Sequence, residues 1–297
     1  MWNKKGNIFN KHHAQLPVVD MYESEIIIYY STRDEKGRSV PMKIKLDNKN
    51  FSPIGTPEKL NVNFGEPGYF DHFGIMPTDI ITKTNGDKYL YYIGWSRRID
   101  IPYHNNLGLL ISHDNGLNWK KYSNGPVFHT SAKEPGYIGT AEILIEGNLW
   151  KMWYLSCQKW IENEPIYDIK YATSDNGLDW KPSGKTCIPL IGNEGGISAA
   201  SILKIENLYH MWFSSRKKFD YRNNKINSYR IYKAISDDGI NWKRIEKPEL
   251  DISKKGWDNI MVCYPEVLRL NDKYIMFYNG NKFGKTGIGY ATRERIT

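Results

Sequence analysis

Apolar and polar positions alternate in short runs separated by turn residues along most of this chain, a pattern that predicts antiparallel strands joined by hairpins. A representative unit begins with an apolar run that is entered through a proline, residues 264–270. A tight polar turn leads into an aromatic-rich run, residues 273–278, and a third run ends at Thr292. Aromatic-rich second runs of this kind occur at residues 26–30, 89–93, 150–155, 209–213 and 274–278. The pattern therefore predicts five similar β-units.

An eight-residue stretch occurs three times and sets the period of the repeat. Each of the segments 112–119, 173–180 and 235–242 contains Asp, Gly and Trp in that order, and the successive Trp residues are 61 and 62 residues apart. A fixed period of this size is typical of repeat architectures. An Asp side chain can accept backbone N–H groups in a turn, Gly supplies a positive φ, and Trp buries a ring at the start of the next strand. We therefore expect structural turns in which Asp114, Asp175 and Asp237 have the same role. In the first unit the turn is degenerate, with Phe51 in place of Trp.

The two ends of the chain complement each other. The last unit stops after its third strand, whereas residues 1–9 resemble residues 118–128, which enter a fourth strand. The predicted fold is all-β: a five-bladed β-propeller with four-stranded antiparallel blades, the last blade closed by the N-terminal strand, in a single domain over residues 1–297. Ring closure removes exposed sheet edges. A β-sandwich with coincidental repeats explains neither the fixed period nor the matching ends.

Composition narrows the class of protein. Aromatic residues make up 14% of the chain, which favours strands. The net charge is +8, but the basic residues are scattered, so we expect no nucleic-acid partner and keep an anionic substrate as an option. The three cysteines lie far apart without metal-ligand spacing, which predicts buried thiols in a reducing compartment and neither a metal nor a cofactor. The chain has no signal-like apolar start and no 18-residue apolar run, which predicts a cytoplasmic protein with no membrane span.

Three carboxylates occupy one position of the repeat. Asp79, Glu142 and Glu266 each lie near the start of a first strand and are each followed by two apolar residues. The fourth unit has Ser201 in this region, and the first unit has Gln15-Leu16-Pro17 with no acid in register. A single acid at a strand start is usually a solvated edge, but three at one position are expected to converge near the axis. Neighbouring carboxylates separate one another's pKa values, which suits acid–base catalysis.

The ends of the second strands, and the loops that lead into the first strands, supply further candidate residues. Arginines there can fork onto a carboxylate or phosphate, or they can pair with the acids. Aromatic residues can stack on sugar rings or belong to the core. His12, His13 and His72 lack regular ligand spacing, so contacts to a substrate are a better interpretation than a metal site. The candidate substrate-binding residues are His13, Gln15, Arg33, His72, Trp95, Arg97, Tyr154, Arg216 and Tyr264.

Five units with an Asp near the start of the second and a Glu near the start of the third resemble the five-bladed glycoside hydrolases. These comprise arabinosidase, xylosidase and fructosidase families and the related mannoside phosphorylases. The resemblance implies that Glu142 is the general acid and that Asp79 tunes it or holds the transition state. These families take a further acid from the first blade, where this chain has Gln15-Leu16-Pro17. The repeated turn is also similar to the Asp box of sialidases, which are six-bladed, whereas this chain has material for five.

The resemblance implies a glycan-processing enzyme that cleaves or transfers a glycosidic bond in the central funnel, with an anionic sugar among the candidate substrates. Glu266 or Asp20 could replace the missing base. Phosphate bound by the arginines could instead replace the nucleophile, as in a phosphorylase. The alternatives from other classes are a non-catalytic carbohydrate-binding propeller and a protein-binding scaffold whose funnel is plugged by side chains.

Overall fold

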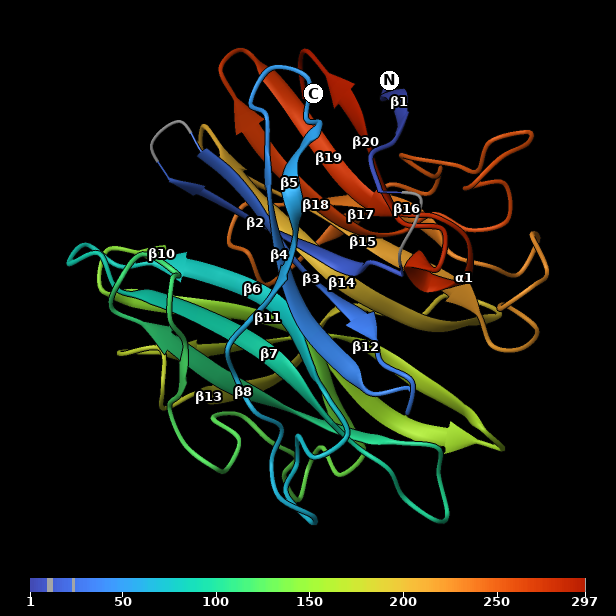
Figure 1. Cartoon of the computed structure of the whole chain (residues 1–297). Coiled ribbons are helices and arrows are strands. Elements are labelled where there is room, and N and C mark those ends of the chain that lie inside the picture. Colours follow the sequence, from blue (N-terminus) through green and yellow to red (C-terminus); the bar gives the residue numbers. More distant parts are fainter. Residues whose placement is uncertain (10–12, 23–24, 297) are drawn as a thin grey trace.

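A computed structural model describes residues 1–9, 13–22 and 25–296 of the chain, so His12 and its predicted contact lie outside the described residues. The described residues form β-sheets and one very short helix, α1 (Asn281–Gly284) (Figure 1). The predicted all-β class is confirmed.

The strands form antiparallel groups that follow the order of the chain. The first sheet consists of β2 (Gln15–Tyr22), β3 (Glu25–Arg33), β4 (Ser39–Leu46) and β5 (Pro53–Lys59). The second consists of β6 (Ile75–Thr82), β7 (Lys88–Ser96), β8 (His104–Ser112) and β9 (Lys120–Lys121). An eight-stranded sheet follows, containing β10 (Tyr137–Glu146), β11 (Leu149–Ile161), β12 (Glu164–Ser174), β13 (Lys181–Ile188), β14 (Glu194–Ile205), β15 (Leu208–Lys217), β16 (Arg230–Ser236) and β17 (Lys243–Arg244). Its two halves, β10–β13 and β14–β17, are linked by one parallel bridge between Tyr167 and Gly196.

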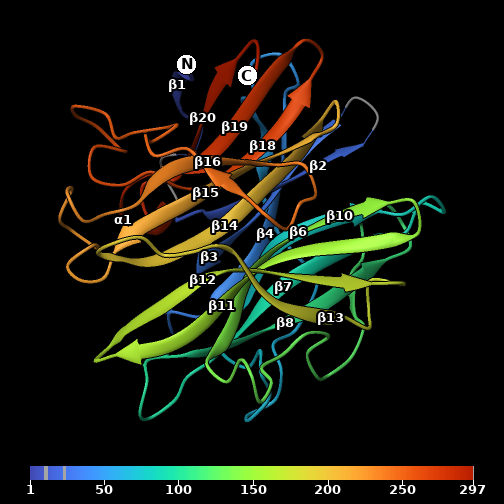
Figure 2. The same cartoon turned by 180° about the vertical axis from the view of Figure 1, so that it is seen from behind.

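The last sheet combines the two ends of the chain. It contains β18 (Cys263–Leu270), β19 (Lys273–Asn279), β20 (Ile288–Arg293) and β1 (Asn3–Asn7), with β1 antiparallel to β20. In both views the N and C ends lie close together beside these strands (Figures 1 and 2). The predicted role of the N-terminal strand as the fourth strand of this sheet is confirmed.

The repeat extends to single positions in the strand register. The first strand of each unit contains a β-bulge or similar irregularity near its start. Beyond it, five equivalent first-strand residues pair with a large aromatic residue of the second strand. The pairs are Val18–Tyr29, Asp79–Tyr91, Glu142–Trp153, Ser201–Trp212 and Glu266–Phe277.

Those aromatic residues also hold neighbouring units together. Each contacts the ring that begins, or stands in for, the fourth strand of the next unit, with ring centroids 5.7–6.4 Å apart. The contacts are Tyr29–Trp119, Tyr91–Trp180, Trp153–Trp242, Trp212–Trp2 and Phe277–Phe51. Trp2 thus supplies the ring for the last unit, and Phe51 replaces the missing Trp of the first. Edge-to-face contacts of this kind add to the stabilisation from burial.

The repeated turns are structural, but the predicted equivalence of their Asp residues is wrong. Asp114 accepts the backbone N–H of Asn118 at 2.8 Å, as expected. In the third copy Asp238 does so instead of Asp237, accepting from Ile240 and Asn241 at 2.8 Å each. In the second copy the accepting residue is an Asn, Asn176, instead of Asp175. The role shifts because the first turn has one more residue between its Ser and its Gly. All three Gly residues have a positive φ of 76–81°, as predicted.

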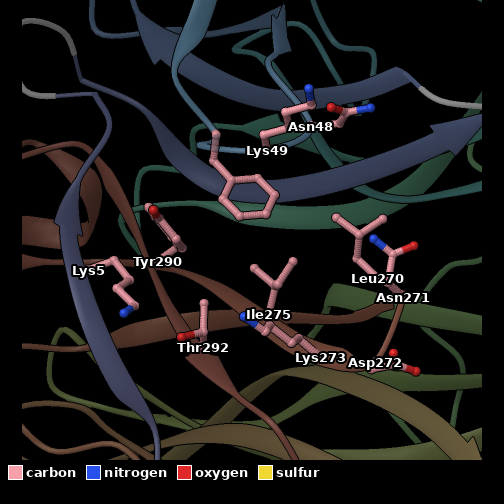
Figure 3. A pocket seen from close by; sticks show the side chains of 11 residues that line it. Lys5, Asn48, Lys49, Leu270, Asn271, Asp272, Lys273, Ile275, Tyr290 and Thr292 are labelled. Atoms are coloured by element: carbon pink, nitrogen blue, oxygen red, sulfur yellow. The ribbon is translucent and has the colours of Figure 1, made fainter.

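The seam between the first and last sheets is hollowed on the outside. A pocket of ≈ 430 Å³ lies there, and Figure 3 shows Asn48 and Lys49 on one wall and Ile275 and Tyr290 on the other. Three lysines line this pocket together with a single acid, Asp272. Among the described residues there is no helix long and apolar enough to cross a membrane.

Candidate functional site

The three predicted carboxylates tie neighbouring first strands together. Asp79 on β6 accepts the N–H of Ile143 on β10 at 2.5 Å. Glu142 on β10 accepts the N–H of Ile202 on β14 at 2.8 Å. The series continues with Ser201 on β14 accepting from Val267 on β18 at 2.9 Å, and Glu266 on β18 accepting from Val19 on β2 at 3.1 Å. Each side chain therefore satisfies one backbone donor of the following unit.

The missing acid of the first unit leaves a gap in this series. Val18 occupies the equivalent position, and its side chain cannot accept a hydrogen bond. In the series, a side chain at position 18 would accept the backbone N–H of Ile80. That N–H instead donates to the other oxygen of Asp79 at 2.7 Å. Asp79 thus uses both carboxylate oxygens to satisfy backbone donors.

Burial disfavours the ionised form of these three acids. Burial raises the pKa of Asp79 to about 8, although its two N–H donors favour the ionised form. Burial, followed by the charge of Asp79, raises the pKa of Glu266 to about 8. Burial and the charges of Asp79 and Glu266 raise the pKa of Glu142 well above its usual range. Raised pKa values favour the protonated form of a carboxyl group, which suits a proton donor better than an ionised base.

A separate pocket lies between the first strands of the sheets. Its floor and walls include one or more residues from β2, β6, β10, β14 and β18, namely Gln15, Leu16, Met76, Gly139, Thr140, Ser198 and Tyr264. Aromatic rings complete the wall: Trp95, Tyr103, Tyr137 and Tyr167. The described residues that line this central pocket include no Asp or Glu, so the three carboxylates are not part of its surface. Its volume is ≈ 70 Å³, room for about two water molecules.

Three polar atoms of the central pocket have no hydrogen-bond partner within the described part of the chain. They are Trp95 Nε1, Asn105 Oδ1 and Ser198 Oγ. Asn105 and Ser198 are 3% and 2% exposed. A buried polar atom without a partner costs about 1–3 kcal/mol, so such atoms indicate a missing partner. The pocket offers a donor, an acceptor and a hydroxyl, beside aromatic faces.

Three of the predicted substrate-binding residues line the central pocket: Gln15, Trp95 and Tyr264. Arg33 lies behind them, donating to Gln15 Oε1 at 2.9 Å and to Ser39, with its guanidinium 5.5 Å from the Trp95 ring centroid. His13 is half-buried, and burial followed by the charge of Arg33 lowers its pKa to about 4. Arg33 and His13 therefore support the pocket wall.

Other predicted residues are occupied elsewhere. Tyr154 is fully buried in the core, and its hydroxyl donates to Glu134 at 2.9 Å. Arg216 is 2% exposed and donates to the carbonyls of Pro165 and Lys217 at 2.5 and 2.9 Å. It also donates to the Tyr167 hydroxyl at 3.3 Å, so its guanidinium positions a residue of the pocket wall. Neither of these two side chains lines the central pocket.

Asp20, considered as a replacement base, is also bound within the protein. Its Oδ2 lies 2.5 Å from Lys88 Nζ, and both side chains are less than 5% exposed. The carboxylate is therefore committed to a buried ion pair.

His72 and Arg97 lie together in a second pocket, at the ends of β7 and β8. His72 Nδ1 is 3.1 Å from the carbonyl oxygen of Gly65, and the Arg97 guanidinium is 3.9 Å from the Phe73 ring centroid.

Sequence reasoning missed Asn105 and the tyrosines Tyr103, Tyr137 and Tyr167. Asn105 pairs with Trp95 across β7 and β8. It could have been found as the residue opposite Trp95 in the predicted hairpin. The three tyrosines occupy positions that the repeat does not mark.

The described residues contain no group of three or more His, Cys, Asp or Glu side chains that could hold a metal ion. Cys157, Cys187 and Cys263 are free and buried, as predicted.

Comparison with known proteins identifies relatives along the whole chain. The chain is 30% identical over 307 residues to the uncharacterized proteins MT1551 and Rv1502 of two Mycobacterium tuberculosis strains, and 99% of this chain and 99% of each relative are covered. The chain belongs to their family. No family model matches it.

Solved structures similar to this MT1551/Rv1502 family member show the fold. A structure described as a glycoside hydrolase has a TM-score of 0.77 at 16% identity, covering 99% of this chain and 92% of that one. A thermostable family-43 glycoside hydrolase has a TM-score of 0.70 at 15% identity, covering 98% and 91%. A third structure is described in these words: the GH130 family of mannoside phosphorylases contains glycoside hydrolases that target beta-1,2 mannosidic linkages in Candida mannan. Its TM-score is 0.71 at 13% identity, covering 96% and 85%. The fold is therefore that of the glycoside hydrolase-like propellers.

Proposed function

We propose that this protein binds a glycan and that the central pocket holds one end of a sugar. The observation that carries the proposal is the set of three unpartnered polar atoms, on Trp95, Asn105 and Ser198, beside aromatic walls. Aromatic faces pack against the C–H faces of a sugar, and a few convergent polar groups select its hydroxyls. The fold shared with glycoside hydrolases and mannoside phosphorylases supports a glycan-processing role.

The architecture that supports this pocket is, in our proposal, a single five-bladed propeller over residues 1–297. The five equivalent ring contacts, Trp2 and Phe51 included, link each unit to the next and the last to the first. The hydrogen bonds from first strand to first strand follow the same order, except at Val18.

The size of the central pocket limits the ligand. Binding sites for small molecules usually occupy about 300–1,000 Å³, several times the ≈ 70 Å³ found here. A sugar therefore enters edge-first, with one or two hydroxyls inside and the remainder of the ligand above the mouth.

Of the forms that this function can take, sugar binding without cleavage is the one that the geometry supports best. Hydrolysis requires two carboxyl groups that flank the scissile bond. In this chain Asp79, Glu142 and Glu266 serve backbone donors, and other residues form the surface of the central pocket.

Cleavage or transfer of a glycosidic bond is the second candidate. The supporting observation is that burial, followed by the charges of Asp79 and Glu266, raises the pKa of Glu142 well above its usual range, as a general acid requires. The Glu142→Gln variant keeps an oxygen for the N–H of Ile202, so it should fold normally. Loss of turnover on a cleavable glycoside would support catalysis, and unchanged turnover would exclude Glu142 as the acid.

Two serines of β14 test the binding proposal. Ser198 Oγ has no partner within the described residues, so Ser198→Ala should raise the free energy of unfolding by about 1 kcal/mol while weakening sugar binding about tenfold. Ser201→Ala is the matched control, because Ser201 is equally buried and accepts from Val267. The control should lose about 1 kcal/mol of stability and keep its sugar affinity.

Calorimetric titration with a panel of neutral monosaccharides and disaccharides, together with urea unfolding, measures both quantities. A panel that binds equally well to wild type and Ser198→Ala would refute the assignment of the pocket.

A further inference from the structure

A second pocket, at the ends of β7 and β8, is strongly basic. It has a volume of ≈ 430 Å³ and lies between the loop at residues 68–73 and the ends of β7 and β8. Its described lining residues include Arg97, Arg98, His72 and His104, and no Asp or Glu. We call it the basic pocket.

The arginines of the basic pocket differ from those elsewhere in the site. The guanidinium groups of Arg33 and Arg216 are used by protein acceptors. For Arg97 and Arg98, the described residues provide no carboxylate within ion-pair distance. The Arg97 guanidinium carbon lies 3.9 Å from the Phe73 ring centroid, a cation–π contact that helps to position the guanidinium.

Nearby charges do not neutralise the basic pocket. Asp71 lies between two lining residues in the sequence, but it is 1% exposed and its carboxylate is 2.5 Å from Lys121 Nζ. Burial, followed by the charge of Arg98, lowers the pKa of His104, so this imidazole is a neutral hydrogen-bonding group at neutral pH. The field in the pocket is set by the two arginines.

The strand register places the two pockets on opposite faces of the β7–β8 hairpin. Trp95 and Asn105 face each other across β7 and β8 and line the central pocket. The next pair toward the strand ends, Ser96 and His104, lines the basic pocket. Successive side chains of a strand point to opposite faces of the sheet, so the basic pocket is a site of its own.

We propose that the basic pocket binds an anionic group, a carboxylate or a phosphoryl group, of a sugar conjugate. That the anion belongs to a sugar conjugate rests on the proposed function, whereas the anion site stands on its own residues. Arg97 and Arg98 supply forked N–H donors for two oxygens of the anion.

Three probes separate the parts of this inference: inorganic phosphate, glucuronate and glucose, each titrated calorimetrically at low and high salt. We expect phosphate or glucuronate to bind more tightly than glucose, with affinity that falls as salt is added. Arg97→Gln and Arg98→Gln should each weaken binding of the anion by about tenfold, and Arg97→Glu should abolish it. Preference for phosphate or for glucuronate identifies the anionic group.

Arg38→Gln is the matched control. Arg38 also stacks on a phenylalanine, Phe64, at 4.4 Å, but it is paired with Asp34 and does not line the basic pocket. Its removal lowers the net charge equally and should leave anion binding unchanged.

Equal losses in Arg97→Gln and Arg38→Gln, or anions that bind no better than glucose, would overturn the anion site. If phosphate binds through Arg97 while no sugar contacts the central pocket, the anion site stands and the proposed sugar function fails.

Discussion

Replacing Glu266 by Gln should make the protein more stable at pH 8 than wild type. Glu266 accepts a hydrogen bond from the N–H of Val19 at 3.1 Å, and the carbonyl oxygen of Gln can accept the same bond. The substitution therefore keeps the connection between the last and first units and removes only the ability to ionise.

The sign follows from proton binding. Burial, followed by the charge of Asp79, raises the pKa of Glu266 from 4.5 to about 8 in the folded protein. Between these pH values the folded chain holds a proton that the unfolded chain has released, so the free energy of unfolding falls as pH rises. The slope is about 1.4 kcal/mol per pH unit, which amounts to about 5 kcal/mol over the window. This stabilisation is complete below pH 4.5 and is lost as pH rises through 8.

Urea unfolding of wild type and Glu266→Gln at pH 5, 6, 7 and 8 measures the difference. The two proteins should be about equally stable at pH 5, and the advantage of the variant should grow with each pH unit. Glu146→Gln is the control: burial opposes ionisation of Glu146, but hydrogen bonds from Lys151 and Lys204 outweigh it and lower its pKa to about 2. Its effect should be constant from pH 5 to 8. Parallel curves for wild type and Glu266→Gln would refute the buried, protonated state of Glu266.

Three further substitutions test the supports of the fold by the same unfolding assay. Asp20→Asn removes the buried partner of Lys88 and should cost about 3 kcal/mol, and a loss below about 1 kcal/mol would contradict the ion pair. Trp2→Ala removes a ring that is 6% exposed and should cost about 3 kcal/mol or more, whereas a freely fraying N-terminus would show no change. Asp238→Ala should cost about 1 kcal/mol through the lost turn hydrogen bonds and Asp237→Ala almost nothing, and the reverse order would restore the sequence-based assignment.

The repeat in the sequence was sufficient to predict the β class and the pairing of the two chain ends. Both depend on periodic features, namely the strand alternation, the Gly turns and the Trp spacing. The match of residues 1–9 to residues 118–128 correctly anticipated that β1 joins the last sheet.

The candidate site was only partly predictable, because bulges change which way side chains face. Sequence position grouped Asp79, Glu142 and Glu266, and in the structure each of them accepts a backbone N–H of another first strand. The first strands are irregular, with a positive φ at Leu16 and Tyr264, and these two residues line the central pocket. The acids beyond the irregularity contact backbone groups of neighbouring strands instead. The turn residue also shifted from Asp237 to Asp238 through a one-residue difference in loop length. Neither effect follows from residue spacing.

A structure of the protein with a bound sugar tests the central claim most directly. The probe would be the tightest-binding saccharide from the calorimetric panel. We predict that its edge lies in the central pocket, with hydroxyls within hydrogen-bond distance of Trp95 Nε1, Asn105 Oδ1 and Ser198 Oγ. A sugar bound instead in direct contact with Asp79, Glu142 or Glu266, with the hydrogen bonds of these acids to the neighbouring strands broken, would contradict the account.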